Sequence, residues 1–559
     1  MTTSQNIIKN IGDIVSSYVN SPSCYISQHI YNSLSDLLEK NYRTYNFATD
    51  KSSTEIANVQ NALFSVNEKT ESRKANGVYY TPEDVCKYLI LNSIIMLIDN
   101  NNQRTYKEQD AINTILEYPQ SVIESLLFQK KFFDPTCGSG EFLLNCFRIK
   151  HAILEQTKPN YTDSDVYNIA KTIYGNDIDD KSTDISKIRL FFEISQYIKN
   201  TRYIGLLAKA LNSQFYNIDY VVYDGTYNNN FDCIIGNPPY VEYGKFENKD
   251  NLQNSYGNIY ADVIKNSLNS LKKGGTLGFV IPLSYISTSR MSSIRNYVIE
   301  NTNTQFILNF GDRPDCLFTG VHQKLNILIA RKGRQEHRLY TSNYKHWYKD
   351  ERKVLLNGCE IKENHHQTDM FIPKIGNQLE ENIYRKVSTS TKENIFESQR
   401  VEGESLYLNM RACFWIKAFS FNPGSNEYKK LTYMPNQVSF VNCVLNSSLF
   451  WLYWTIMSDC WHITTKELKG FLIPELTSEQ YLLFDQLSQN LEEKLENTKK
   501  YIGTKQADYE YKHKECKNEI DAIDNLLASI YDLTNDELSY IKSFALKYRM
   551  GSGADDKDN

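Results

Sequence analysis

Short apolar runs alternate with helically periodic segments between residues 132 and 330. The runs have the length of buried strands, and several end at Asp, Gly or Pro, which interrupt strands. This alternation predicts an α/β fold with a doubly wound, mostly parallel, Rossmann-like sheet. The predicted strands are a short one that begins at Phe132, 173–177, one ending at Asp219, 233–235, 276–282, 306–310 and 325–330.

A helix is predicted before the first of these strands. Thr81 is expected as its N-cap, Pro82 at its first position and Asp84 in its first turn, where a carboxylate favours the helix dipole. The residues expected to form its buried face recur at helical spacing. They are Tyr88, Leu91, Ile95 and Ile98.

The parallel pattern ends near residue 333, which divides the chain into regions. We expect a helical segment at 1–75, a catalytic domain at 76–333 and an aromatic, irregular domain at 334–480. Helical spacing of apolar residues, as at Phe484, Leu491 and Leu495, predicts helices over 481–550. Small and acidic residues at 551–559 predict a disordered tail.

Composition restricts the classes of protein to which the chain can belong. At 559 residues, 41% hydrophobic and 13% aromatic, it is a globular chain of more than one domain. A net charge of −5 excludes a uniformly basic surface, so any contact with nucleic acid must be local. The 11 cysteines include no C-x-x-C pair, so neither a zinc site nor a disulfide framework is expected. No secretory signal or membrane-length apolar run is present, which predicts a cytoplasmic protein.

The segment from Asp134 to Gly140 reads as a strand, a glycine-containing turn and the start of a helix. This layout is typical of a nucleotide-type ligand loop at the carboxyl end of the first strand of a doubly wound sheet. It is neither G-x-G-x-x-G nor a P-loop. The acidic residue precedes the glycines, which favours a cationic or hydroxyl-bearing ligand over a pyrophosphate.

Two later strand ends also carry carboxylates. Asp177 ends the second predicted strand, where it is placed to accept hydrogen bonds from ribose hydroxyls. A third acidic strand end lies at Asp219 or at Asp224, and a carboxylate there could accept an adenine amino group. The spacing does not choose between the two, and we favour Asp219.

The fourth strand ends in the sequence Asn237-Pro238-Pro239-Tyr240. The prolines stiffen the turn and remove N–H donors, so Pro238 can offer only its carbonyl. Asn237 offers a side-chain carbonyl, and Tyr240 a flat face with a polar tip. Acceptors beside an aromatic plate on a stiff loop suit a planar ring that bears an –NH2 group.

These motifs together resemble the gamma-class N6-adenine DNA methyltransferases, the TaqI-like branch. The resemblance covers about 76–333 and rests on the order of several independent motifs. They are Tyr-Tyr-Thr-Pro at 79–82, D-P-T-C-G-S-G at 134–140, G-N-D-I-D at 175–179, N-P-P-Y at 237–240, N-I-Y-A-D at 258–262, K-K-G-G-T-L-G-F-V-I-P at 272–282 and the turn at Phe318.

The resemblance implies a role for each motif. S-adenosylmethionine would be the cofactor, with Asp177 on its ribose and Asp219 at its adenine; no metal is expected. Asn237 and Pro238 would accept hydrogen bonds from the target N6 amine, and Tyr240 would stack on the flipped base together with Phe318 or the nearby His322. The further residues implied to surround the cofactor are Tyr80, Thr81, Asp134, Cys137, Gly138, Gly140, Ile178 and Asn237.

The resemblance also places a target-recognition domain after the catalytic motifs, at 334–480. Its expected partner is double-stranded DNA, and a separately encoded restriction endonuclease is a further candidate partner. Basic residues interleaved with aromatics at 334–353 suggest either a solvated linker or a nucleic-acid face at the rim of this domain, in which Arg338 and Lys345 would contact phosphates. Site choice is expected to depend on Arg411, Lys417 and Lys466.

Other substrates remain open at this stage. An N-P-P-Y motif also suits an RNA adenine or a protein glutamine amide, although those enzymes would leave the C-terminal residues unexplained. Cytosine N4 is chemically close to adenine N6. A non-enzymatic DNA-binding subunit is a further alternative, which the intact motifs disfavour.

Overall fold

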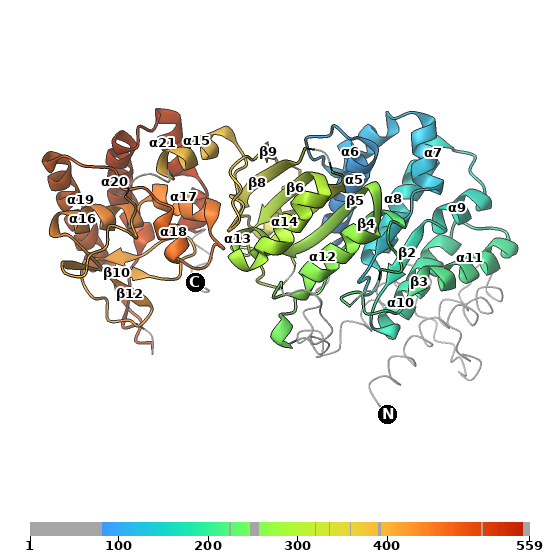
Figure 1. Cartoon of the computed structure of the whole chain (residues 1–559), viewed down its shortest axis with the longest axis horizontal. Coiled ribbons are helices and arrows are strands. Elements are labelled where there is room, and N and C mark those ends of the chain that lie inside the picture. Colours follow the sequence, from blue (N-terminus) through green and yellow to red (C-terminus); the bar gives the residue numbers. More distant parts are fainter. Residues whose placement is uncertain are drawn as a thin grey trace, which may run out of the picture.

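A nine-stranded sheet forms the centre of the larger of two lobes (Figure 1). The computed structural model describes residues 81–551, apart from 223–224, 246–255, 319, 335, 358, 389–392 and 505–506. The segment 1–75, Tyr80, Asp224 and residues 552–559 of the expected tail therefore lie outside the described residues. In spatial order the strands are β3 (Phe215–Tyr216), β2 (Ile173–Asn176), β1 (Phe132–Asp134), β4 (Phe231–Gly236), β5 (Leu271–Pro282), β7 (Leu325–Lys332), β6 (Thr302–Phe310), β8 (Arg338–Lys345) and β9 (Lys362–Glu363).

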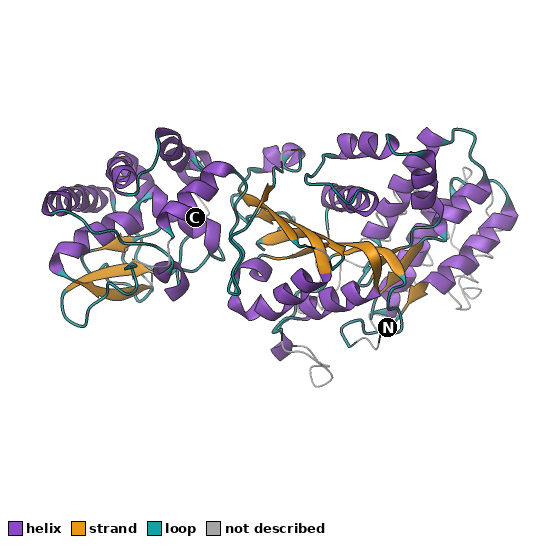
Figure 2. Cartoon of the chain, turned by 45° about the horizontal axis from the view of Figure 1, so that its top comes forward, coloured by secondary structure: helices purple, strands orange, loops and turns teal. Residues whose placement is uncertain are grey.

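Most neighbouring strands of this sheet run parallel, as predicted. The exceptions are β7, which is antiparallel to β5 and β6, and β9, which is antiparallel to β8. Figure 2 shows helices on both faces of the sheet. Successive residues of β4 serve the two faces, since Ile234 belongs to one hydrophobic core and Cys233 and Ile235 to the other. The doubly wound α/β fold is therefore confirmed.

The helices of this lobe cover the sheet in sequence order. Contacts with β5 and β7 place α5 on one face, beside α8, while α12 contacts β5 and α14 contacts β6. They are α5 (Glu83–Ile98), α6 (Glu108–Leu116), α7 (Gln120–Phe128), α8 (Glu141–Thr157), α9 (Asp163–Ala170), α10 (Asp180–Ser195), α11 (Thr201–Gln214), α12 (Ile259–Ser270), α13 (Ser284–Ser287) and α14 (Ser292–Asn301).

The first described helix differs from its prediction in two ways. Pro82, not Thr81, is the N-cap of α5, because the extended ψ of 149° at Pro82 lets its carbonyl accept the first helical N–H groups, from Val85 and Cys86. The helix is also buried on nearly all sides rather than along one face, because the sheet, α6 and α8 all pack against it. Only Ile98 of the expected face is partly exposed.

The sheet continues past residue 333, where the parallel pattern was expected to end. β8 pairs in parallel with β6, so the expected boundary falls between two strands of one sheet. The strand escapes sequence reasoning because Arg338 and Lys345 stand at its ends and polar Thr341 and Ser342 are buried in its middle. The third strand was also misplaced: β3 ends at Tyr216, before Asp219.

The second lobe contains the rest of the chain (Figure 1). Helices α16 and α17 are its core, and the predicted helical region packs on them through Phe484, Leu491 and Leu495 of α19. A three-stranded sheet of order β11-β10-β12 lies beside them. The elements are α15 (Gln378–Val387), β10 (Glu404–Asn409), β11 (Ala418–Phe419), β12 (Tyr428–Tyr433), α16 (Pro435–Asn446), α17 (Ser448–Met457), α18 (Thr465–Lys469), α19 (Ser478–Thr498), β13 (Lys500–Tyr501), β14 (Tyr509–Glu510), α20 (Lys517–Ile530), α21 (Asn535–Ser543) and α22 (Leu546–Met550).

Helices α16 and α17 are strongly apolar, and their burial accounts for this. Among the helices the structure describes, none alone is long and apolar enough to cross a membrane; α16 and α17 reach that length only as a pair, bent by 63°. Nearly all of their residues are buried against the other helices of the lobe. Their apolar character is therefore that of a core.

Candidate active site at the carboxyl ends of the strands

The loop after β1 turns sharply into α8. Asp134 ends the strand with its side chain buried, and its Oδ1 accepts the N–H of Thr136 at 3.0 Å. Gly138 and Gly140 adopt φ values of +52° and +85°, which favour glycine. A Cβ on Gly140 would lie 3.0 Å from Ser186 Oγ, so the loop also approaches α10 closely at this residue. The sequence prediction of a strand, a glycine turn and a helix is confirmed.

Asp177 closes this loop from the end of β2. Its Oδ2 accepts the N–H of Gly138 at 2.8 Å, and its Oδ1 accepts the N–H of Asp179 at 3.0 Å. The adjacent Ile178 is 64% exposed, which is unusual for a large apolar side chain beside a strand end. A carboxylate and an exposed apolar surface thus lie next to the glycine loop.

Asn176, which the sequence reasoning missed, ties three loops together. Its Nδ2 donates to the carbonyls of Pro135 and Ile218, at 2.9 and 3.1 Å, and its Oδ1 accepts the N–H of Ile218 at 3.0 Å. These bonds hold the loop after β3, where Asp219 accepts the N–H of Val221 at 3.1 Å. An asparagine inside a G-N-D motif gives no sequence signal for such long-range contacts.

Two residues of α10, also missed, support the glycine loop from behind. Ser186 Oγ donates to the carbonyl of Gly138 at 2.7 Å, and the Cys137 thiol donates to Ser186 Oγ at 3.6 Å. Arg189 donates to the carbonyl of Ser139 at 2.5 Å and forms an ion pair with Glu141. Both α10 side chains are buried, so they fix the loop rather than contact solvent.

Asn237 lies at the next strand end, directly beside the loop after β1. β4 pairs with β1, and a Cβ on Gly236 would lie 2.7 Å from Asp134 Oδ1. Glycine at 236 therefore permits the two strand ends to approach. Asn237 Oδ1 accepts the hydroxyl of Tyr240 at 2.5 Å, and the Tyr240 ring meets the Tyr260 ring edge-on with centroids 6.4 Å apart. Pro238 is buried.

Burial shapes the acidity of the groups in the glycine loop. Burial raises the pKa of Asp134 well above its usual range, the charge of Asp177 adds to that rise, and the Thr136 N–H opposes it. Burial likewise raises the pKa of the Cys137 thiol, which stays protonated at neutral pH. A nearby cation would favour the ionised form of Asp134.

Of the two aromatic rings considered for the target base, one is buried and the other exposed. The Phe318 side chain is only 1% exposed and packs in the core beside α5, while its carbonyl accepts the N–H of Val321 at 2.9 Å. His322 is exposed, and its Nδ1 lies 3.1 Å from the carbonyl of Asp312, to which it can donate. Both residues lie on the segment between β6 and β7.

The basic residues expected to contact DNA occupy different environments. Arg338 and Lys345 are the ends of β8 and half-buried. Lys417 is half-buried, and its burial lowers the pKa of its ammonium. The Lys466 ammonium donates to the carbonyls of Ser287 and Met457, at 2.8 and 3.1 Å, and therefore ties the two lobes together.

Lys466 therefore holds two backbone carbonyls in this structure, and its role in site choice stays a prediction. Arg411 remains exposed, with its guanidinium 3.6 Å from Glu427.

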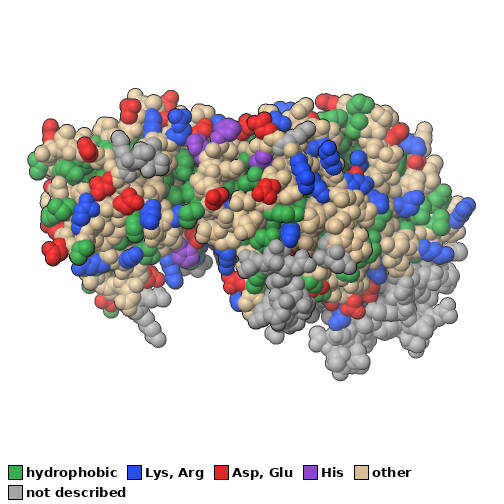
Figure 3. All heavy atoms as spheres, viewed as in Figure 1, with side chains coloured by type: hydrophobic (Ala, Val, Ile, Leu, Met, Phe, Trp, Pro, Cys, Tyr) green, Lys and Arg blue, Asp and Glu red, His purple; other side chains and the backbone are tan. Residues whose placement is uncertain are grey.

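A cationic and aromatic cluster that the sequence reasoning missed lies where the two lobes meet. The Lys324 ammonium lies 4.7 Å, and the Arg313 guanidinium 5.8 Å, from the centre of the Trp461 ring. Arg313 and Lys324 flank the segment that carries Phe318, while Trp461 belongs to the second lobe. On the face shown in Figure 3, Lys and Arg side chains are otherwise interspersed with Asp and Glu.

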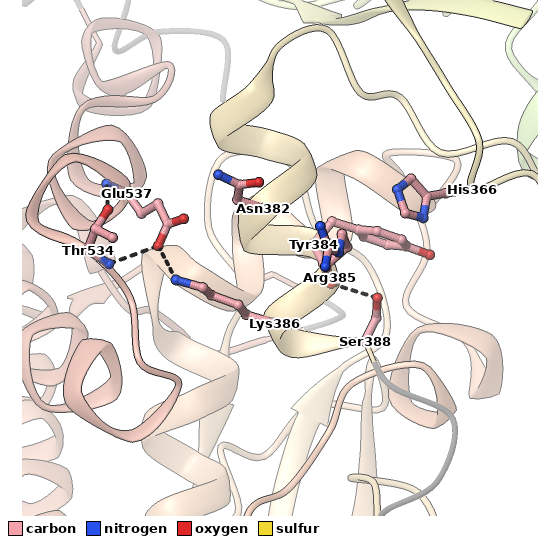
Figure 4. Close-up of a pocket in the computed structure, with 8 residues that line it drawn as sticks. All are labelled: His366, Asn382, Tyr384, Arg385, Lys386, Ser388, Thr534 and Glu537. Carbon is pink, nitrogen blue, oxygen red and sulfur yellow. Dashed lines mark hydrogen bonds and ion pairs between the residues drawn. The ribbon is translucent and has the colours of Figure 1, made fainter.

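A separate cavity of about 580 Å³ lies in the second lobe, between α15 and α21 (Figure 4). Its wall includes the ion pair between Lys386 and Glu537, at 2.7 Å. It contains none of the residues around Asn237. The lining residues are His366, Asn382, Tyr384, Arg385, Lys386, Ser388, Thr534 and Glu537.

The comparisons with known proteins agree with this geometry. Residues 171–316, which include the strand end at Asn237, match the family model described as Eco57I restriction-modification methylase. Over these residues the chain is similar to the methylases of restriction-modification systems. This similarity agrees with the gamma-class resemblance that the order of its motifs implied.

Curated relatives match parts of this chain. The type II restriction enzyme and methyltransferase RM.Eco57I of Escherichia coli is 24% identical over 291 residues, which are 44% of this chain and 29% of that protein. The type II methyltransferase M.HincII of Haemophilus influenzae is 35% identical over 116 residues, 19% of this chain and 22% of that protein. The chain thus spans less than a third of the length of either relative.

A solved structure resembles almost the whole of this chain. The type IIL restriction-modification enzyme MmeI, solved in complex with DNA, superposes with a TM-score of 0.52 at 12% identity. The similarity covers 98% of this chain and 94% of MmeI, so the two-lobe arrangement is shared as a fold.

Proposed function

We propose that this chain is a site-specific DNA methyltransferase that transfers a methyl group from S-adenosylmethionine to adenine N6 in double-stranded DNA. The observation that carries the proposal is the position of Asn237 and Pro238 at the end of β4, directly beside the glycine loop after β1. The acceptors for an amine and the loop for a cofactor therefore lie at adjacent strand ends, where doubly wound sheets bind ligands.

The residues of the glycine loop fit this cofactor. Asp177 offers a half-buried carboxylate for ribose hydroxyls, and Ile178 offers an exposed apolar surface for a flat ring. The hydroxyl of Thr136 is buried without a hydrogen-bond partner in the described part of the chain. Burial disfavours the ionised form of Asp134, and a positively charged ligand would offset this effect. S-adenosylmethionine supplies a methyl group on a positively charged sulfur that is already a good leaving group.

The role of Asn237 and Pro238 follows from the chemistry of the target amine. The lone pair of an adenine amine is delocalised into the ring, which makes the nitrogen a poor nucleophile. Acceptance of its two hydrogens by Asn237 Oδ1 and the Pro238 carbonyl would draw the nitrogen toward tetrahedral geometry. The same acceptors would disperse the positive charge that develops as the new N–C bond forms. The remaining contribution is alignment of the amine with the methyl group.

The target base must leave the duplex to reach this site. Flipping costs a few kcal/mol, and stacking on aromatic faces returns about 1–3 kcal/mol per base. Tyr240 is half-buried beside Asn237 and is proposed as one stacking face. Phe318 is proposed as the second, although its ring is buried in this structure, and the exposed His322 is its competitor.

Sequence choice is assigned to the second lobe. A pocket for one flipped base carries no information about neighbouring bases, which must be read in the grooves or through DNA shape. Arg313 and Trp461 mark the junction of the lobes and support a duplex contact there. We further propose that a separately encoded endonuclease is a partner of this chain and that the chain is cytoplasmic.

Methylation of genomic DNA provides the decisive test. The purified chain is incubated with unmethylated genomic DNA and S-adenosylmethionine in excess chelator, and modified bases are mapped by long-read sequencing. N6-methyladenine at one recurring site, without a metal requirement, is expected. Modification of cytosine, of RNA or of a protein glutamine, with adenine in DNA unmodified, would overturn the proposal.

A further inference from the structure

Arg352 joins two segments that lie far apart in the sequence and both belong to the proposed active site. Its Nε and Nη2 donate to the two carboxylate oxygens of Asp84, at 2.7 and 2.9 Å. Its Nη1 donates to the carbonyl of Leu317 at 2.8 Å. Asp84 lies three residues after Thr81, on the cofactor side, and Leu317 immediately precedes Phe318, on the target-base side. One guanidinium therefore sets the spacing between the two segments.

The geometry of this contact requires arginine. A planar guanidinium can bind a carboxylate with two parallel N–H groups while a third N–H points elsewhere, which a lysine ammonium cannot reproduce. The Asp84 side chain is 40% exposed and that of Arg352 21% exposed. A bidentate arginine–carboxylate pair is among the stronger ion pairs, and solvent at this exposure screens part of its contribution to folding stability. The bidentate geometry also fixes the orientation of the two segments relative to each other.

The 3-10 turn that carries Arg352, Lys349–Val354, is also attached to the end of the chain. Glu351 pairs with Lys547 and accepts the hydroxyl of Tyr548 at 3.0 Å. Helix α22 is in turn fixed to the second lobe, because the Arg549 guanidinium stacks on Trp415 and Trp451, 4.0 and 4.4 Å from the ring centres. The turn thus connects the second lobe to both sides of the active site.

We propose that Arg352 is a positioning residue that couples cofactor binding to duplex binding. A duplex held by the second lobe would stabilise the turn, and the turn would hold the Thr81 segment and the Phe318 segment at their working separation. Linkage requires the effect to be reciprocal, so the cofactor must strengthen duplex binding by the same factor. This inference rests on the proposed function and lies outside residues 171–316, the part that matches the family model.

The coupling factor is measured by calorimetry with S-adenosylhomocysteine as the probe. The ratio of its Kd without and with a duplex bearing the mapped site gives the factor, which is expected to be about fivefold or more in the wild type. Arg352→Lys keeps the charge but loses the fork, and Asp84→Asn weakens the other partner. Both variants are expected to bring the factor close to one, and the double variant to add nothing further.

Lys353→Ala is the matched control, because Lys353 is the exposed neighbour on the same turn. It removes one positive charge without touching Asp84 or Leu317, and is expected to keep the wild-type factor. Near-ultraviolet circular dichroism and Tm establish whether each variant is folded. If Arg352→Lys does not fold, Asp84→Asn still tests the inference.

A purely structural role for Arg352 predicts a different result. Lower Tm with an unchanged coupling factor in both variants would overturn the inference while leaving the proposed function intact. A coupling factor of one in a wild-type chain that methylates DNA would also overturn the inference and leave the proposed function intact. A wild-type chain that transfers no methyl group to adenine would overturn the proposed function, and the inference with it.

Discussion

The hydroxyl of Tyr240 donates to the side-chain carbonyl of Asn237 across 2.5 Å, and it also lies 3.1 Å from the carbonyl of Val280. The acceptor proposed for the target amine is therefore held by a donor from its own motif. A carbonyl oxygen has two lone pairs, so it can accept a second hydrogen bond without losing the first. Tyr240 would then orient Asn237 as well as stack on the base, which is a form of electrostatic preorganisation.

Asn237→Ala is expected to remove turnover while leaving cofactor affinity nearly unchanged. The side chain acts on the amine, and loss of a preorganised group of this kind lowers kcat by about 10²–10³. Single-turnover rates and calorimetry with S-adenosylhomocysteine measure the two properties separately. Loss of cofactor binding in this variant would contradict the division of roles.

Tyr240→Phe separates the hydroxyl of Tyr240 from its ring. Because the stacking face remains, the KM for DNA is expected to stay close to the wild-type value, while kcat falls by about tenfold as Asn237 loses its orienting donor. Tyr240→Ala removes both the hydroxyl and the ring, and is expected to raise the KM for DNA in addition to lowering kcat. Equal losses in the two variants would show that the hydroxyl, not the ring, carries the whole effect.

Asp177→Ala is expected to weaken cofactor affinity by about 10- to 100-fold, the usual effect of losing hydrogen bonds to a charged group. Its Oδ2 also accepts the Gly138 N–H, so part of the loss would come from the loop. Asp180→Ala is the control, because this neighbouring carboxylate is exposed at the start of α10. Calorimetry measures the cofactor affinity of both variants. Equal affinities in Asp177→Ala and Asp180→Ala would exclude Asp177 as a cofactor contact.

Local patterns were sufficient to predict the strand ends that form the site. Asp134 and Asn237 each follow an apolar run, and a parallel order brings such ends to one edge of a sheet. Asn176 and Arg189 were missed because their partners lie in loops or helices at least 41 residues away along the chain. Contacts of that range leave no periodicity in the sequence.

The later part of the chain was harder to predict for a related reason. β8 has charged ends and a polar centre, so its pattern suggested a basic linker, yet it is an inner strand between β6 and β9. Lys466 was expected to affect site choice, and the sequence gives no sign that two backbone carbonyls accept hydrogen bonds from its ammonium. A fragment ending at residue 333 would lose β8, and we do not expect it to fold.

Two histidines, the half-buried His346 and the buried His513, predict a loss of stability in acid. Burial lowers the pKa of His346 to about 4 and that of His513 to about 3, both below the usual value. Since the folded pKa lies below the unfolded one, the contribution to stability is present above about pH 6.5 and is lost as pH falls toward 4. Each unit of difference corresponds to about 1.4 kcal/mol.

The measurement is the free energy of unfolding as a function of pH. His346→Gln is expected to flatten the curve between pH 6.5 and 4, whereas the same change at the exposed His365 is expected to leave its slope unaltered. Identical slopes in the wild type and His346→Gln would exclude that histidine as a source of acid sensitivity.

Substitution of a residue that contacts DNA phosphates and of a residue that reads a base should affect DNA binding in different ways. Arg313, 5.8 Å from the Trp461 ring centre, lies beside the Phe318 segment and is expected to contact a phosphate. Arg313→Ala should therefore weaken binding to all sequences alike and change the log–log salt slope by about 0.9. Arg411, exposed on the second lobe, is expected to read a base, so Arg411→Ala should cost about 1–3 kcal/mol at the preferred site only. Lys209→Ala, on the exposed surface of α11, is the control. Salt titrations measure the slope and the sequence preference of the three variants. The same slope and the same preference in all three would refute both assignments.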